Sequence, residues 1–412
     1  MNKIVLCFFC VVGLFASCKA EEVIYRPMFD CSKSLIEPYG IVAHISRTGP
    51  SFEYDTREKG LDIIKSASIS NVRVDFDWTS FRRGYVRDSV SFEVFDKMMK
   101  SVCERHLNML GVISNTDTEH FPLWCYQTEM LVKRYKESVN YWEIVNEADL
   151  IFKKNPNYTP KEYVSILKAG YNIIKRNKNK SKVLYTGLDA NAERSFFEET
   201  LKMGAASYFD IMNVHFYTVH RGPEVLIDYY GVLKKKLSKY NIRKPVWMTE
   251  CGYPTKGELS ETEEEQAIRL PRAYLVSFAC GVDKVFWYNL KASELTENDR
   301  ECHFGILHKD YTTKPAYLAY KTLIKMCPNK STRPVLSQMD GLYLAKWKRT
   351  DGIKVVALWS SKGEIPIKIN SKSRYKCYNV FGKENAFSQD NTIVSQSILY
   401  LEGNKEINIV ID

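Results

Sequence analysis

The sequence predicts a (β/α)8 barrel followed by a small all-β sandwich, and three observations lead to that prediction. Short apolar segments alternate between residues 39 and 328 with segments that have the spacing of amphipathic helices. Eight of these apolar segments occur, the number of strands in this kind of barrel. After Pro328 the pattern changes to short strand-like segments separated by polar turns, which is typical of a sandwich.

The expected elements follow from these periodicities. The eight barrel strands are expected at 39–45, 71–78, 108–114, 141–147, 182–187, 209–217, 245–250 and 282–289. Helices are expected at 57–67, 92–105, 163–175 and 263–279, with a last helix opening at Lys314-Pro315, where proline suits a helix start. Sandwich strands are expected at 342–347, 353–359, 365–369, 375–380, 398–401 and 407–411. Asp351-Gly352 is expected to form a tight hairpin turn.

The chain start is typical of an export signal. Met1-Asn2-Lys3 is followed by an apolar run and then by Ala16-Ser17, as in a secretory signal peptide. Cys18 after Phe15-Ala16-Ser17 resembles a bacterial lipobox, although Phe replaces the usual Leu, so we expect membrane attachment through lipid on Cys18. The alternative is an ordinary signal cleaved nearby. No later run approaches the ~18 apolar residues of a membrane span.

These features divide the chain into four parts. The parts are a signal peptide (1–17), an N-terminal tether (18–38), the barrel (39–328) and the β-sandwich (329–412). The expected location is the bacterial periplasm or outer membrane, as a lipoprotein. For the sandwich we expect a structural role, with sugar binding as the alternative.

The cysteine spacing and the charge distribution disfavour a metal site and a nucleic-acid partner. Of 11 cysteines, Cys7 and Cys10 leave with the signal, and the eight after Cys18 are scattered singly without metal-ligand spacing. We therefore expect buried thiols and no metal or cofactor, with one or two disulfides left open. The formal charge of +10 favours a solvated basic surface, with an acidic glycan as the alternative. Without a basic and aromatic cluster, nucleic acid is disfavoured as a partner.

Two expected strands end on a glutamate. Tyr141-Trp142-Glu143-Ile144-Val145-Asn146-Glu147 closes on Asn-Glu, and Lys244-Pro245-Val246-Trp247-Met248-Thr249-Glu250 closes on Glu. Parallel barrels place their chemistry at the C-terminal ends of the strands. Two carboxylates at such ends are what glycoside hydrolysis needs, one to protonate the leaving oxygen and one to attack the anomeric carbon.

This pair of motifs resembles the retaining glycoside hydrolases of clan A, in particular family 39-like and family 5-like enzymes, over roughly residues 39–326. Each motif alone is weak, but their order and the three βα units between them are specific. The resemblance implies that Glu147, after strand 4, is the general acid/base and that Glu250, at the end of strand 7, is the nucleophile. It implies that Asn146 binds the sugar 2-hydroxyl.

The resemblance assigns further residues to the pocket. Arg73 inside strand 2 matches the arginine near the nucleophile, since a barrel interior rarely accepts an unpaired Arg. Tyr217 matches the strand 6 tyrosine that donates to the nucleophile. Trp287 at the end of strand 8 matches the tryptophan on which a sugar ring stacks.

Three more residues are candidates from their position alone. His215 shares a strand face with Tyr217 by the period of two, so we expect it in the same pocket, with a satisfied core histidine as the alternative. His44 and Trp78 end strands as well, and either pocket lining or ordinary packing would explain them.

The function predicted from these residues is a retaining glycosidase that acts on an oligosaccharide or polysaccharide. A catalytically silent cell-surface glycan-binding protein is the alternative, although such a protein is expected to lose one carboxylate. A metal-dependent barrel hydrolase is disfavoured, because none of the 7 histidines form the His-x-His pair it needs. The sugar, its linkage and exo or endo action remain open, since pocket loops set specificity within one fold.

Overall fold

The computed structural model describes residues 22–411. Within that range it leaves out the stretches 47–53, 77–91, 118, 156, 190–193, 218–219, 294–295, 297, 371–373 and 386–391.

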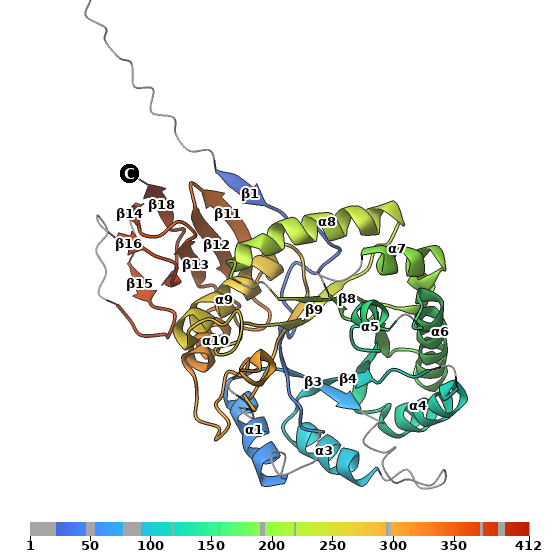
Figure 1. Cartoon of the computed structure of the whole chain (residues 1–412). Coiled ribbons are helices and arrows are strands. Elements are labelled where there is room, and N and C mark those ends of the chain that lie inside the picture. The colour runs from blue at the N-terminus through green and yellow to red at the C-terminus, as the bar shows by residue number, and fades with distance from the viewer. Residues whose placement is uncertain are drawn as a thin grey trace, which may run out of the picture.

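A curled parallel sheet forms the centre of the molecule (Figure 1). Its strands are β2 (Tyr39–Val42), β3 (Asn71–Phe76), β4 (Asn108–Ile113), β5 (Val139–Ile144), β6 (Lys182–Leu184), β7 (Leu188–Asp189), β8 (Met212–Phe216), β9 (Val246–Cys251) and β10 (Lys284–Trp287). They are ordered β6-β5-β4-β3-β2-β10-β9-β8-β7. A parallel bridge between Leu184 and Ile211 joins the two ends of the sheet and closes the barrel. The predicted (β/α)8 fold is confirmed, with β7 as a short addition beside β8.

Helices cover the outside of the sheet (Figure 1). They are α1 (Tyr54–Ser66), α3 (Glu93–Glu104), α4 (Phe121–Tyr135), α5 (Ala148–Lys154), α6 (Pro160–Asn177), α7 (Arg194–Lys202), α8 (Leu226–Lys239), α9 (Glu263–Ala279) and α10 (Pro315–Met326). Single 3-10 turns are formed by Ala205–Tyr208, Pro223–Val225 and Arg300–Cys302. Both α6 and α9 begin with a capping box, Thr159 with Glu162 and Thr262 with Glu265, which satisfies amides that have no partner within the helix. The helices α4, α5, α7 and α8 are not among those predicted above.

The second domain consists of two antiparallel sheets. The larger contains β1 (Val23–Tyr25), β11 (Val335–Met339), β12 (Leu342–Lys348), β13 (Lys354–Ser360), β15 (Tyr375–Tyr378) and β17 (Leu399–Gly403), and the smaller contains β14 (Ile365–Asn370), β16 (Thr392–Val394) and β18 (Asn408–Ile411). Side chains alternate between two cores along each strand. On β12, Leu342 and Leu344 face the core between the two sheets, while Ala345 and Trp347 belong to the core shared with the barrel.

The N-terminal segment takes part in this second domain. β1 pairs antiparallel with β11, so that Ile24 faces Ser337 across the ladder. The segment expected to be a tether therefore adds an edge strand to the large sheet, beside β11 in Figure 1.

Two buried tryptophans attach the sandwich to the barrel. Trp347 Nε1 donates to the Met326 carbonyl at 2.8 Å, and Trp359 Nε1 donates to Glu224 at 2.7 Å. Buried indole groups need such partners, so the contacts fix the sandwich against the barrel helices. Among the described residues no helix is long and apolar enough to cross a membrane, and the eight cysteines after Cys18 are all free thiols.

Candidate active site

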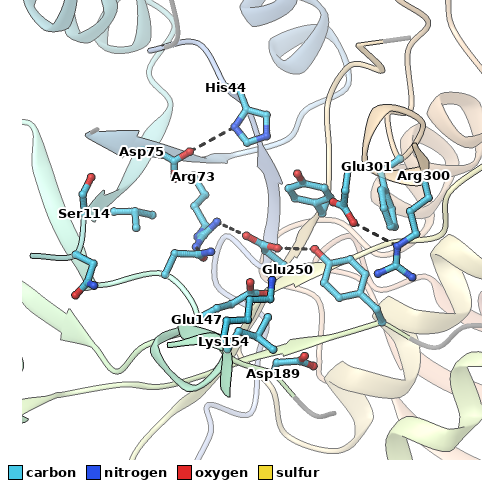
Figure 2. Close-up of a pocket in the computed structure, with 17 residues that line it drawn as sticks. His44, Arg73, Asp75, Ser114, Glu147, Lys154, Asp189, Glu250, Arg300 and Glu301 are labelled. Carbon is cyan, nitrogen blue, oxygen red and sulfur yellow. Dashed lines mark hydrogen bonds and ion pairs between the residues drawn. The ribbon is translucent and has the colours of Figure 1, made fainter. Parts of the chain in front are cut away.

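A pocket of about 850 Å³ opens at the C-terminal ends of the barrel strands (Figure 2). Its lining is mostly polar and comes from strand ends and from the loops that follow them. The lining residues are His44, Arg73, Asp75, Val112, Ser114, Asn115, Asn146, Glu147, Leu150, Lys154, Asp189, Tyr217, Glu250, Tyr288, Arg300, Glu301 and Phe304. Six of the residues predicted from sequence therefore meet in one cavity: His44, Arg73, Asn146, Glu147, Tyr217 and Glu250.

An unusual backbone turn after β5 brings Asn146 and Glu147 to the pocket together. Successive side chains of a strand point to opposite faces, yet both of these line the cavity. Val145 and Glu147, on either side of Asn146, adopt φ values of 66° and 47°. Positive φ is a rare conformation for a β-branched residue such as Val145. Each such residue costs about 1–3 kcal/mol of folding free energy, so the surrounding contacts must hold the turn in place.

Glu250, at the end of β9, is held by two donors. Arg73 Nη1 lies 2.6 Å from its Oε1, and the Tyr217 hydroxyl donates to its Oε2 at 2.5 Å. The carboxylate is almost completely buried. Both carboxylate oxygens therefore accept a hydrogen bond from a donor that fixes their orientation at the edge of the cavity. The predicted contacts of Arg73 and Tyr217 with Glu250 are confirmed.

Glu143 on β5 belongs to the same network. Arg73 donates to it twice, from Nε at 2.8 Å and from Nη2 at 2.9 Å, and the Gly187 amide donates at 3.2 Å. The same Nη2 also donates to the Asn146 amide oxygen at 2.6 Å. Burial lowers the pKa of the Arg73 guanidinium, but Glu143 and Glu250 outweigh it and raise that pKa well above its usual value. Glu143 therefore sets the orientation in which Arg73 reaches Glu250 and Asn146.

The sequence contains a signal for Glu143 that the strand ends do not reveal. It is a charged residue in the middle of an otherwise apolar strand, as Arg73 is in β3. A charge at the centre of a buried strand implies a partner of opposite sign. The two central charges could therefore have been paired.

His215 on β8 is completely buried and is not a lining residue of the pocket, as the alternative of a satisfied core histidine has it, but it contacts both glutamates. Its Nδ1 lies 2.9 Å from Glu147 Oε1 and 3.6 Å from Glu250 Oε2, and its Nε2 lies 3.0 Å from Thr249 Oγ1. The Thr249 hydroxyl donates to Asn213 at 2.8 Å, so it accepts from Nε2–H. Burial lowers the pKa of His215, but Glu250 and Glu147 outweigh it and raise the pKa above its usual value. Nδ1 lies within hydrogen-bond distance of Glu147 Oε1 and couples the imidazole to that carboxyl group.

The backbone at position 187 lies so close to His215 that only glycine fits there. A Cβ atom there would lie 2.0 Å from His215 Nε2, far inside van der Waals contact. Gly187 also supplies the amide that binds Glu143. The backbone after β6 can thus approach the imidazole closely only without a side chain.

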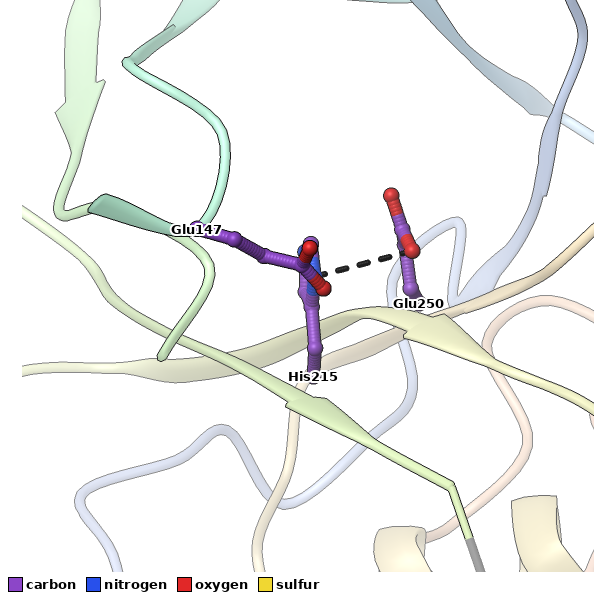
Figure 3. Close-up of side chains that lie close together, drawn as sticks. All are labelled: Glu147, His215 and Glu250. Carbon is purple, nitrogen blue, oxygen red and sulfur yellow. Dashed lines mark hydrogen bonds and ion pairs between the residues drawn. The ribbon is translucent and has the colours of Figure 1, made fainter. Parts of the chain in front are cut away.

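Glu147, His215 and Glu250 form a compact group (Figure 3). One ligand atom of each lies within 4.8 Å of the others, so a carboxylate oxygen of Glu147 is at most 4.8 Å from one of Glu250. Among the described residues these three could offer ligands to a metal ion. The Arg73 guanidinium, 2.6 Å from Glu250, opposes a cation there, because like charges repel at this range. The arrangement is better suited to two carboxylates acting on the two atoms of one substrate bond.

One predicted site residue is wrong by a single position. Trp287 is completely buried and packs against Tyr253 with ring centroids 6.1 Å apart, and it does not line the pocket. Tyr288 lines it instead, beside Tyr217 and Phe304. The alternation of side chains at the end of β10 directs position 288 inward and position 287 toward the helices. At the end of β10, Tyr288 and not Trp287 is thus the aromatic residue that a ligand in the pocket can contact.

The other two candidates left open by the sequence are His44 and Trp78. His44 lines the pocket, with Nδ1 3.5 Å from Asp75 Oδ2. Asp75, two positions after Arg73 on the same strand face, lines the pocket as well, and the period of two would have found it. Trp78 lies outside the described residues.

Part of the chain, including both glutamates, matches the model of a known protein family. Residues 115–306 match the model described as glycosyl hydrolase catalytic core. The resemblance to clan A is therefore confirmed at the level of the fold and of this core, and the match supports a glycosidase.

Three solved glycoside hydrolases have a similar architecture. A family 39 glycoside hydrolase from Bacteroides cellulosilyticus WH2 is similar with a TM-score of 0.73 at 20% identity, over 89% of this chain and 81% of its own. A glucosidase from Croceicoccus marinus has a TM-score of 0.64 at 14% identity, over 93% and 98%. A monomeric β-xylosidase from Caulobacter crescentus CB15 has a TM-score of 0.65 at 10% identity, over 90% and 97%. No curated protein matches the chain.

Proposed function

We propose that this protein is a retaining glycosidase that cleaves a glycosidic bond by double displacement. The observation that carries the proposal is the approach of Glu147 and Glu250 to within 4.8 Å between oxygens, with His215 between them. Retaining enzymes have carboxyl groups roughly 5–5.5 Å apart, whereas inverting enzymes keep about 6.5–9.5 Å to admit a water molecule. The compact pair fits the retaining geometry.

In the first step, Glu250 attacks the anomeric carbon while Glu147 protonates the departing oxygen. The glycosidic bond breaks as the bond from the carbon to Glu250 forms, and the leaving group departs as an alcohol. Arg73 and Tyr217 donate to Glu250 and orient it for this attack. The proton comes from the pair of Glu147 and His215.

In the second step, Glu147 removes a proton from water, which attacks the same carbon and releases Glu250. Each displacement inverts the configuration, so the product has the anomeric configuration of the substrate. Asn146, fixed by Arg73 at 2.6 Å, is placed to bind a sugar hydroxyl beside the reacting carbon. A hydrogen bond of this kind stabilises the transition state more than the ground state.

The proposed substrate is an oligosaccharide or polysaccharide. The similar structures include a glucosidase and a β-xylosidase, so one architecture serves different sugars and the fold does not select one. The alternative, a silent glycan-binding protein, is opposed by the complete set of donors around Glu250. A binding protein has no need of a buried carboxylate oriented by two donors beside a second carboxylate.

A screen of aryl glycosides tests the proposal. We expect the purified protein to release the phenol from at least one nitrophenyl glycoside in a panel that varies the sugar and the anomer. Release from one member only would identify the sugar. Failure to cleave any member, or any natural polysaccharide offered beside them, would contradict the glycosidase assignment.

We also propose that the protein is exported and anchored by lipid on Cys18, which precedes the described residues. The replacement Cys18→Ser is expected to move it from the membrane fraction to the soluble fraction of the producing cells. Wild-type protein found already in the soluble fraction would favour the ordinary secretory signal.

A further inference from the structure

The strained turn that carries Glu147 is closed by one hydroxyl from outside it. Thr186, which follows β6, donates through Oγ1 to the Val145 carbonyl at 2.8 Å and accepts from the Ala148 amide at 2.9 Å. The Val145 carbonyl and the Ala148 amide flank Asn146 and Glu147 on either side. A single hydroxyl, one donor and one acceptor, therefore spans both ends of the turn.

The two backbone groups have little other support. Ala148 is the first residue of α5, and amides in the first turn of a helix have no partner within it. Leaving such groups unpaired in a buried place is costly. Val145, Ala148 and Thr186 are all completely buried, so water does not replace the hydroxyl.

Thr186 is itself held firmly. Its amide donates to the Tyr163 hydroxyl at 2.8 Å, and the next amide, of Gly187, donates to Glu143 at 3.2 Å. A second contact joins the same two segments, because the Asp189 amide donates to Asp149 Oδ2 at 3.0 Å. The segment between β6 and β7 that supplies the hydroxyl is thus a rigid reference for the turn.

From this geometry we infer that Thr186 is a positioning residue for the proposed acid/base, keeping the Glu147 carboxyl at the leaving oxygen. The inference rests on the proposed function. Thr186 does not line the pocket, so it touches no substrate and acts only through the turn. Losing the hydroxyl should displace the Glu147 end of the turn, while Arg73 still holds Asn146. The hydrogen bonds from Arg73 and Tyr217 to Glu250 do not involve Thr186, so the nucleophile should stay in place.

The test replaces the hydroxyl by a methyl group, as Thr186→Val. Misplacement of a catalytic group by 1 Å can cost about 10²-fold in rate. We expect kcat/KM to fall by about 10²-fold on an alkyl glycoside, whose poor leaving group needs the acid, and by less than about threefold on a dinitrophenyl glycoside, which leaves without it. Thr186→Ser keeps the hydroxyl and should restore activity on both.

Thr128→Val is the matched control. Thr128 is also completely buried, and its hydroxyl has no hydrogen-bond partner, so the same replacement there should leave both rates unchanged. Should Thr186→Val not fold, as judged by its thermal unfolding, Thr186→Ala removes the same hydroxyl and has the same expected selectivity.

The outcomes separate the inference from the function on which it rests. Equal rates for wild type and Thr186→Val on both substrates would overturn the positioning role while leaving the glycosidase standing. An equal loss on both substrates, or no rescue by Thr186→Ser, would also overturn it. A wild type inactive on both substrates and on the whole aryl glycoside panel would instead overturn the proposed function.

Discussion

Glu250→Ala is expected to abolish turnover on every glycoside that the wild type cleaves. No covalent intermediate can form without this carboxylate, whatever the leaving group. Removing the nucleophile of a hydrolase can cost about 10⁶-fold, so we expect a loss of at least about 10⁴-fold in kcat. Folding should persist, because Arg73 keeps both of its hydrogen bonds to Glu143.

Added azide shows whether the variant Glu250→Ala lacks the nucleophile. In Glu250→Ala, azide can attack only from the side that the carboxylate occupied, so an activated substrate should give a glycosyl azide of inverted configuration. Glu264→Ala, which removes an exposed carboxylate on α9, is the control and should keep full activity. A glycosyl azide of retained configuration from Glu250→Ala would assign the nucleophile to another residue.

Glu147→Ala is expected to show a loss that depends on the leaving group. Without the proton donor, alkyl glycosides should react about 10²- to 10⁴-fold more slowly, the usual contribution of a positioned acid. Dinitrophenyl glycosides should still transfer their sugar to Glu250. Hydrolysis of that intermediate then becomes slow, because the base that activates water is missing, and a burst of phenol should precede a low steady rate.

Azide should accelerate this variant on activated substrates. It needs no base and attacks the glycosyl-enzyme, so the glycosyl azide should have the configuration of the substrate. Stopped-flow traces of phenol release and NMR spectra of the azide product provide the two measurements. If kcat/KM fell by the same factor on alkyl and dinitrophenyl glycosides, Glu147 would not be the acid.

The predictable part of the fold came from periodicity. Barrel strands β2 to β6 and β8 to β10 lie within or close to the expected segments, because buried parallel strands are continuous apolar runs. The helix α7 is harder to predict. Its apolar side chains Phe196 and Phe197 are neighbours in the sequence, so they do not show the spacing of three to four residues that marks a helix. The strand β1 owes its existence to a partner more than 300 residues away, which no local pattern records.

The predictable part of the site came from strand ends. Glu147 and Glu250 close apolar segments, and tertiary structure brings them together because all parallel strands end at one face of the barrel. The error at Trp287 arose because a strand's last residue and the next one point to opposite sides, so a boundary error of one residue exchanges them. The Thr186 contact depends on the hydrogen bonds of a backbone turn with positive φ at Val145 and Glu147, which residue types alone do not reveal.

The configuration of the first product formed by the wild-type protein tests the central claim most directly. Proton NMR of a cleavable glycoside, recorded within the first minutes and before mutarotation mixes the anomers, distinguishes the two hydrolysis mechanisms. Double displacement through Glu250 predicts that the hemiacetal appears first with the anomeric configuration of the substrate. A first product of the opposite configuration would contradict a covalent intermediate on Glu250.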